Sequence, residues 1–352
     1  MSRITGKRVT KTLLAGTTIL SLLGWLYKCG PAVAADITAP PGYNVSVFAQ
    51  NPPNTSQPDS VAVDGDKVYV GYGNGTKSDG TDNLPTTVAE YTKSGQLVKT
   101  FSVPGHNDGL RVNPITHQVY ALLNQDGNPK LTIIDPRTSF EQTYILPSIN
   151  GGGGYDDLVF LNGQIFIDAS EPTLDSNGVN TNPILATLTL RRGRATVTPV
   201  LYGNTTAVDS ATGQTITLNF TDPDSLGITP KGDLIIDGEA DKNLITVKNP
   251  GTSLQQVSVV SHPDYVADDT VFAPKAESTL LVADTSGGAV YQITGPFDRG
   301  NAYISASSAG YVGILNLTNG ETTPVFTGFG SPHGLGFLTQ KGRFEDFTGW
   351  YK

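Results

Sequence analysis

Six residues able to carry charge stand at the same position of a short repeated phrase. Each opens a run of strand-forming residues, as in DSLGI (224–228) and HGLGF (333–337). In chain order the six are Asp59, Asp108, Asp156, Asp224, Asp268 and His333, spaced 44 to 68 residues apart. Strand-rich repeats of about fifty residues are typical of β-propellers, in which each repeat forms one blade. We therefore expect these six side chains, here called the acidic ring, to meet at one mouth of a central channel.

Five carboxylates held close together cannot all remain ionised unless something offsets their charge, because like charges raise one another's pKa. A divalent cation would offset it, and Ca²⁺ takes six to eight oxygen ligands of this kind. We therefore predict a cation, with Ca²⁺ as the first choice, held by Asp59, Asp108, Asp156, Asp224 and Asp268. Since His333 is not a usual calcium ligand, it predicts a general base beside the cation or, alternatively, a transition metal.

A purely structural role for the acidic ring is the competing hypothesis. An aspartate that enters a strand from a turn often accepts hydrogen bonds from nearby backbone N–H groups. Under that hypothesis His333 is a capped, half-buried imidazole. Two ring residues are followed by a second acid, Asp157 and Asp269. Because side chains alternate along a strand, at most one acid of each pair is expected to face the channel.

The residues after the ring positions show the alternation of a β-strand. In SLGI (225–228) and GLGF (334–337), large apolar residues alternate with serine or glycine. Such a period of two is the pattern of a strand, and small residues on one side suit strands that converge around a channel. Arg111 interrupts the small positions, and we expect it to reach toward the acidic ring.

Further strands are expected in each repeat, and the chain shows no convincing helical periodicity. Second strands are predicted at 67–71, 118–123, 164–167, 233–236 and 279–283, and extra strands near the C-terminus at 302–307, 312–317 and 323–327. Too few residues follow Phe337 for a whole blade, so the strand at 43–49 is expected to complete the last one and close the ring. The predicted fold is an all-β propeller of six four-stranded antiparallel blades, with seven blades as the alternative.

Ligand-binding loops are expected on the face that carries the acidic ring. An antiparallel second strand ends at the face where the first strand began, so the polar residues at those ends should gather there. The candidates for contact with a ligand are Arg111, Glu171, Glu239 and Asp284. Among them Glu171 and Glu239 form a candidate acid–base pair.

Residues 1–35 are predicted to be a secretory signal, and residues 36–352 the propeller domain. A basic head, a short apolar run and the small residues of AVAA (32–35) match such a signal, with cleavage after Ala34 or Ala35 and an uncleaved anchor as the alternative. Cleavage would change the formal net charge from −9 to −14 and remove the single cysteine, which excludes disulfides. We expect an exported, acidic monomer without stable membrane insertion that binds a small molecule or protein rather than nucleic acid.

The stretch DDTVFAPKAESTLLVADTSGGAVYQI (268–293) resembles the blade of NHL-type propellers and of the gluconolactonase/regucalcin-like superfamily. DSLGITPKG (224–232) and HGLGF (333–337) are weaker copies. The resemblance implies a six-bladed propeller with a divalent cation held in the channel by Glu, Asn and Asp. By position it implicates Asp108, Asp224 and Asp268. This chain has aspartate where that blade usually has asparagine, and Asp59 where the first repeat usually has glutamate.

Two functions follow from these observations. The first is a secreted propeller whose acidic channel mouth binds a cation and whose loop face binds a ligand. The alternative is a metal-dependent hydrolase of lactone-like esters, in which the cation polarises a carbonyl and an aspartate or His333 acts as the base.

Overall fold

The computed structural model describes residues 36–262, 264–274 and 277–338. In these residues strands dominate, and the one helical element is the short 3₁₀ turn η1 (Ser307–Ala309). The predicted signal at 1–35 lies outside the described residues, so its cleavage stays a prediction. Within the described residues, no helix has the length and apolar character needed to cross a membrane.

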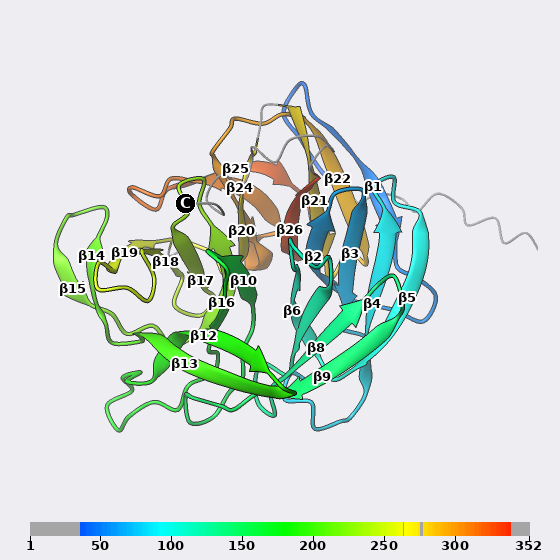
Figure 1. The fold of residues 1–352 in the computed structure, drawn as a ribbon. Helices are drawn as coiled ribbons and strands as arrows, with labels where there is room; N and C mark the ends of the chain where they lie inside the picture. Colours follow the sequence, from blue (N-terminus) through cyan, green and yellow to red (C-terminus); the bar gives the residue numbers. More distant parts are fainter. Residues whose placement is uncertain (1–35, 263, 275–276, 339–352) are drawn as a thin grey trace, which may run out of the picture. The chain divides into compact units, whose positions relative to one another are not determined.

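Six antiparallel sheets surround a central channel, and each is one blade of a propeller (Figure 1). Blade 1 consists of β2 (Pro58–Asp64), β3 (Lys67–Tyr72), β4 (Pro85–Thr92) and β5 (Leu97–Pro104). Blade 2 consists of β6 (Asn107–Val112), β7 (Val119–Leu123), β8 (Lys130–Asp135) and β9 (Phe140–Ile145). Blade 3 consists of β10 (Leu158–Leu161), β11 (Gln164–Asp168), β12 (Pro183–Arg191) and β13 (Arg194–Tyr202).

The fourth blade carries an extension. It consists of β16 (Pro223–Ile228), β17 (Leu234–Gly238), β18 (Asn243–Lys248) and β19 (Gln256–Ser261). A hairpin of β14 (Thr206–Asp209) and β15 (Thr215–Thr217) adds to its outer edge, where β14 runs parallel to β19. The core four strands remain antiparallel, so the predicted blade design is confirmed, with one addition at the rim.

The last two blades are interleaved along the chain. Blade 5 consists of β20 (Ala267–Phe272), β23 (Ala302–Ala306), β24 (Tyr311–Leu315) and β25 (Thr322–Thr327). Blade 6 consists of β26 (Pro332–Leu338), β21 (Glu277–Asp284), β22 (Ala289–Pro296) and β1 (Asn44–Gln50). After β20 the chain therefore crosses to blade 6 for one hairpin and then returns to finish blade 5.

This interleaving corrects the interpretation of residues 268–293 as a single blade. β20 pairs with β23 and not with β21, which pairs with β26. The alternating pattern of β21 fits either neighbouring sheet equally well, so sequence alone did not distinguish the two pairings. The extra C-terminal strand candidates are real, and they supply the outer three strands of blade 5.

The propeller closes as the sequence predicts. β1 pairs with β22 and forms the outer strand of blade 6, whose inner strand β26 comes from the other end of the chain. Joining the first and last strands in one sheet leaves no gap in the ring and ties the two ends of the domain together. The count is six blades, so the seven-bladed alternative is excluded.

Most inner strands carry a β-bulge at the ring position. In β2, for example, Pro58 pairs with Tyr72 and Val61 with Val70, so two residues, Asp59 and Ser60, face one. The same shift occurs in β6, β16, β20 and β26. A bulge bends its strand and redirects the side chains at the extra residue. The repeated bulge therefore aims the ring residues at the channel.

Glycines next to the ring allow neighbouring inner strands to approach closely. A Cβ on Gly109 would lie 2.2 Å from the carbonyl oxygen of Asp156, and one on Gly334 would lie 2.3 Å from that of Asp59. Any side chain at these two positions would force the blades apart. The expectation that small residues mark the convergence of blades is confirmed.

Candidate functional site

The six ring residues come together as two groups of three. Asp59, Asp108, Asp224, Asp268 and His333 each occupy the second position of an inner strand, and Asp156 lies two residues before β10. Ligand-type atoms of Asp59, Asp268 and His333 lie within 4.8 Å of one another. The same holds for Asp108, Asp156 and Asp224. We call these groups the histidine trio and the carboxylate trio.

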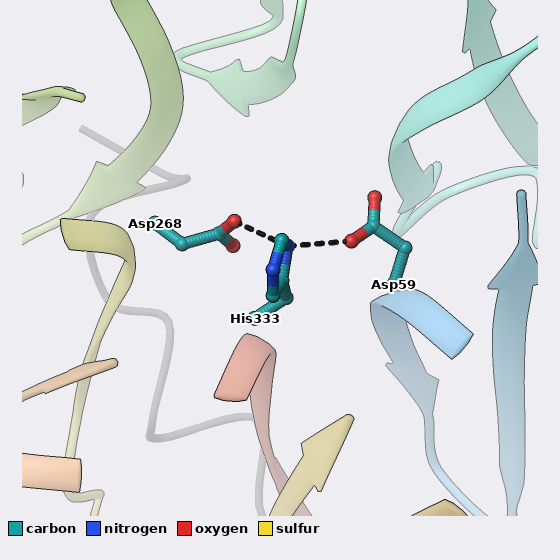
Figure 2. Close-up of side chains that lie close together, drawn as sticks. All are labelled: Asp59, Asp268 and His333. Atoms are coloured by element: carbon teal, nitrogen blue, oxygen red, sulfur yellow. Dashed lines mark ion pairs between the residues drawn. The ribbon is translucent and has the colours of Figure 1, made fainter. Parts of the chain in front are cut away.

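In the histidine trio, the imidazole lies between two carboxylates (Figure 2). His333 Nδ1 is 2.8 Å from Asp59 Oδ1 and 2.7 Å from Asp268 Oδ2. The other ring nitrogen, Nε2, is 3.1 Å from the hydroxyl of Ser331. Both nitrogens therefore lie within hydrogen-bond distance of oxygen atoms of the protein.

The charges of the histidine trio compensate one another in part. Burial opposes the charged imidazole, but Asp268 and Asp59 outweigh it and raise the pKa of His333 well above its ordinary value. Burial likewise opposes the charge of Asp59, yet the imidazolium lowers the pKa of that carboxyl. The pKa of Asp268 stays raised by burial despite His333, partly because Asp59 is also negative. One imidazolium thus neutralises only one of the two carboxylates.

The carboxylate trio contains no positive side chain, and hydrogen bonds with Ser170 and Asp108 only partly offset the raised pKa of Asp156. Burial raises the pKa of all three carboxyls well above the ordinary value, and neighbouring acids raise it further: Asp59 and Asp156 act on Asp108, Asp168 acts on Asp156, and Asp268 acts on Asp224. Asp156 is 4% exposed, and its Oδ1 has no hydrogen-bond partner among the described residues. A buried, unpaired carboxylate oxygen is costly unless a proton or a cation occupies it.

A small cavity lies inside the channel against the ring. Its volume is about 30 Å³, and its lining includes Asp108, Asp224, Asp268, Asp269 and Arg111. A space of this size accommodates a single ion or a water molecule but no organic ligand. Both acids of the Asp268–Asp269 pair line it, which corrects the expectation that only one faces the channel. The reason is the bulge in β20, which interrupts strict alternation at those two residues.

Arg111 reaches from blade 2 to Asp157 of the adjacent blade 3. Its Nη2 donates to Asp157 Oδ2 and, at 2.9 Å, to the carbonyl oxygen of Leu226. Asp157 also accepts the Leu226 N–H at 3.1 Å, so blades 2, 3 and 4 are joined here. Arg111 thus reaches into the channel as predicted, but its guanidinium pairs with Asp157 rather than with a ring aspartate.

Two further buried acids support this layer and were not singled out from the sequence. Asp168 accepts the backbone N–H of Asp157 at 2.6 Å, and Asp237 accepts the hydroxyls of Ser225 and Thr270 at 3.1 and 3.0 Å. Both residues stand near the ends of second strands. The sequence shows that these ends are polar, but it does not show that the two carboxyls are buried.

The candidates for ligand contact fall in different surroundings. Glu239 is half-buried near the ring, and burial together with Asp268 and Asp222 raises its pKa to about 7. Glu171 is exposed and acts on Asp222, whose pKa burial raises to about 6. Asp284 is fully buried and accepts backbone N–H groups of Gly287, Gly330 and Ser331 at 2.8–2.9 Å. Asp284 therefore lies beneath the surface and holds the backbone of these loops through its hydrogen bonds.

The donor set of the carboxylate trio fits a hard cation. Three carboxylates converge from blades 2, 3 and 4, one of their oxygens is unpaired, and an ion-sized cavity adjoins two of them. The donors are oxygen atoms, which Ca²⁺ prefers over nitrogen. The histidine trio offers a mixed set of nitrogen and oxygen donors, and the transition-metal alternative stays a prediction for that trio.

The fold and channel define a six-bladed β-propeller with an acidic centre, and solved structures of this type are similar to it. A streptogramin B lyase covers 83% of this chain and 91% of its own, at 12% identity and a TM-score of 0.49. A periplasmic gluconolactonase of Pseudomonas aeruginosa covers 81% of this chain and 89% of its own, at 10% identity and a TM-score of 0.47. Virginiamycin B lyase of Staphylococcus aureus covers 80% of this chain and 89% of its own, at 12% identity and a TM-score of 0.45.

No family model matches the sequence, and no curated protein matches it. At these identities and TM-scores the likeness carries no conclusion about activity. The six-bladed architecture rests on the strand pairing described above.

Proposed function

We propose that this chain is an exported β-propeller that binds one divalent cation, Ca²⁺ in the first instance, through Asp108, Asp156 and Asp224. The observation that carries the proposal is the unpaired Oδ1 of Asp156 within a trio of carboxylates that contains no positive side chain. A cation would satisfy that oxygen and remove the repulsion that raises the three pKa values. The histidine trio, which already contains a positive charge, is not a ligand group in this proposal.

The cation would also stabilise the face that binds a ligand. Each of its three ligands comes from a different blade, so binding would hold blades 2, 3 and 4 together at the channel mouth. The loops around this mouth carry Glu171, Asp222 and Glu239. Such a surface would favour cationic or neutral ligands over anionic ones.

The test is the metal content of the purified protein, measured by elemental mass spectrometry, with thermal melts before and after chelation. We expect one equivalent of cation and a lower melting temperature after its removal. Asp156→Asn should lose the cation. The matched control is Asp175→Asn on an exposed loop, where an amide oxygen keeps the hydrogen bonds that the carboxylate accepts from Asn177 and Val179. Absence of metal together with insensitivity to chelator would make the aspartates purely architectural.

Export is a separate part of the proposal, supported by the basic head, apolar run and AVAA (32–35) of the N-terminus. Sequencing the N-terminus of protein recovered outside the cytoplasm should place the first residue after Ala34 or Ala35. An intact N-terminus on that protein would exclude cleavage.

A second candidate function, hydrolysis of lactone-like esters, is favoured by one observation. Glu239 lies near the ring and has a pKa of about 7, which suits proton transfer at neutral pH. In this function a bound cation would polarise the carbonyl of the ester. Glu239 would take a proton from water and return it to the leaving oxygen, while His333, held as imidazolium, would keep Asp59 ionised. Screening of lactones with wild type and Glu239→Gln tests it: activity that survives in the variant with its cation bound excludes Glu239 as the base.

A further inference from the structure

The channel opens into a second, larger cavity at the end opposite the ring. Its volume is about 620 Å³, and residues from the inner strands of all six blades line it. We call it the apolar cup. Its rim is formed by residues near the C-terminal ends of the inner strands, such as Val63, Val112 and Ile228. Val63 follows Asp59 by four residues on β2, so the rim lies roughly 13 Å from the ring.

The walls of the cup expose apolar side chains to an open space. Val63, Val112, Ile228 and Phe272 are each only half-buried, although they stand on the innermost strands of the fold. Leaving such side chains in contact with water forgoes about 25 cal/mol for each Å² of apolar surface. A concave apolar space of 300–1,000 Å³ with a few polar groups is the usual form of a site for small molecules.

The floor of the cup supplies those polar groups. Arg111 and Asp269 line both this cavity and the small cavity against the ring, so they separate the two. The guanidinium of Arg111 is already paired with Asp157. Asp269 Oδ2 accepts the backbone N–H of Leu335 at 2.8 Å, whereas its Oδ1 has no hydrogen-bond partner among the described residues. Asp269 is 4% exposed, so this oxygen is both buried and unsatisfied.

The unsatisfied oxygen of Asp269 indicates which chemical group of a ligand would complement the floor of the apolar cup. Because the positive charge of Arg111 is neutralised by Asp157, the floor presents an acceptor rather than a site for anions. A carboxylate head would be repelled by Asp269, while a hydroxyl or ammonium group would supply the missing hydrogen bond.

We propose that the apolar cup binds a small apolar molecule that ends in a hydrogen-bond donor, an alcohol or a primary amine, with the donor directed at Asp269. The apolar body of the molecule packs against the half-buried side chains of the rim. This site differs from the proposed cation site, because Asp108, Asp156 and Asp224 do not line the cup.

Burial raises the pKa of Asp269 to about 7, so the test is made at pH 8.5, where the carboxylate is ionised. Three naphthalene compounds of equal size test the proposal by equilibrium dialysis at that pH: 2-naphthalenemethanol, 2-naphthylmethylamine and 2-naphthoate. The alcohol and the amine should bind, and the carboxylate should bind at least tenfold more weakly. Val63→Trp places a large side chain in the rim and should lower the affinity for the alcohol and the amine at least tenfold. Leu254→Trp adds the same side chain at an exposed position outside the cup and should leave both affinities unchanged.

Asp269→Asn separates the role of the carboxylate from that of the apolar wall. The amide oxygen can still accept the Leu335 N–H, so the fold should persist, and thermal melts check this. We expect about a tenfold loss of amine affinity and a loss of less than about threefold for the alcohol. Equal binding of all three compounds, no binding of any, or equal effects of the two tryptophan substitutions would each overturn the proposal.

Discussion

The two halves of the acidic ring occupy the same position of the repeat but differ in how their charge is offset. In the histidine trio an imidazolium lies 2.7–2.8 Å from two carboxylates. In the carboxylate trio there is no positive side chain, and burial and neighbouring acids raise every pKa. One substitution in the repeat, histidine for aspartate in blade 6, therefore divides six equivalent positions into two chemically different sites.

The difference teaches that the residue type at a repeated position does not determine its function. Asp59 and Asp108 start inner strands of adjacent blades with the same bulge. Yet the pKa of Asp59 is lowered and that of Asp108 is raised, because one of them lies next to His333. The position places the carboxylate, and the residue at the same position of the adjacent blade decides whether it needs an external cation.

The largest expected effect is on cation affinity. The double substitution Asp108→Asn with Asp224→Asn removes two of the three proposed ligands and should weaken cation binding by at least two orders of magnitude. Asp59→Asn, in the histidine trio, should weaken it by less than about tenfold. Isothermal titration calorimetry with Ca²⁺ measures both. If the two variants lose affinity equally, the ring acts as one site and the division into trios is wrong.

The next effect is on stability. His333→Gln leaves Asp59 and Asp268 without their positive partner and should lower the free energy of unfolding by about 2–4 kcal/mol, less than for a fully buried pair because all three side chains are partly exposed. Denaturant titration of the cation-free protein measures the loss. As the control, His117→Gln, at an exposed pair with Asp64, should cost less than about 1 kcal/mol. A similarly small loss for His333→Gln would contradict the inference that His333 is a charged imidazolium between Asp59 and Asp268.

A change of pH should separate cation-free from cation-loaded protein. Carboxyls whose pKa is raised on folding destabilise the folded state above that pKa, and the penalty disappears as pH falls toward the ordinary value near 4. His333, whose pKa is raised, contributes stability below its ordinary pKa and loses it as pH rises through the folded pKa. The carboxyls and His333 therefore both favour the folded state more as pH falls. Acidification from pH 8 to pH 5 should stabilise the cation-free protein.

The cation-loaded protein should respond in the opposite direction, because protons compete with the cation for the same oxygens. Thermal melts from pH 8 to pH 5, with chelator and with saturating Ca²⁺, should therefore converge as pH falls. Parallel curves over that range would exclude binding at groups with raised pKa values.

The smallest expected effect concerns Glu239, which stands beside the ring without belonging to either trio. Glu239→Gln should change Ca²⁺ affinity by about twofold to fivefold at pH 8, where the carboxylate is ionised, and by less at pH 6, where it is mostly protonated. Titration calorimetry at the two pH values measures the difference. A loss as large as that of Asp156→Asn would make Glu239 a ligand.

What the sequence by itself determined is the local pattern and its repetition. Alternation of large and small residues is a property of neighbouring residues, so the strands, the six ring positions and the closing role of 43–49 were predictable from it. The glycines of the inner strands likewise predicted that neighbouring blades approach closely, since only a residue without a side chain fits there.

What only the tertiary structure decided are the contacts between repeats. The crossing of β21 and β22 into blade 6, the bulge that turns both Asp268 and Asp269 inward, and the pairing of His333 with Asp59 and Asp268 join residues far apart in the chain. The alternating pattern of a strand does not determine which of two sheets it joins when both bury the same face. The ionisation of a ring carboxyl depends on the charges that neighbouring blades bring close to it.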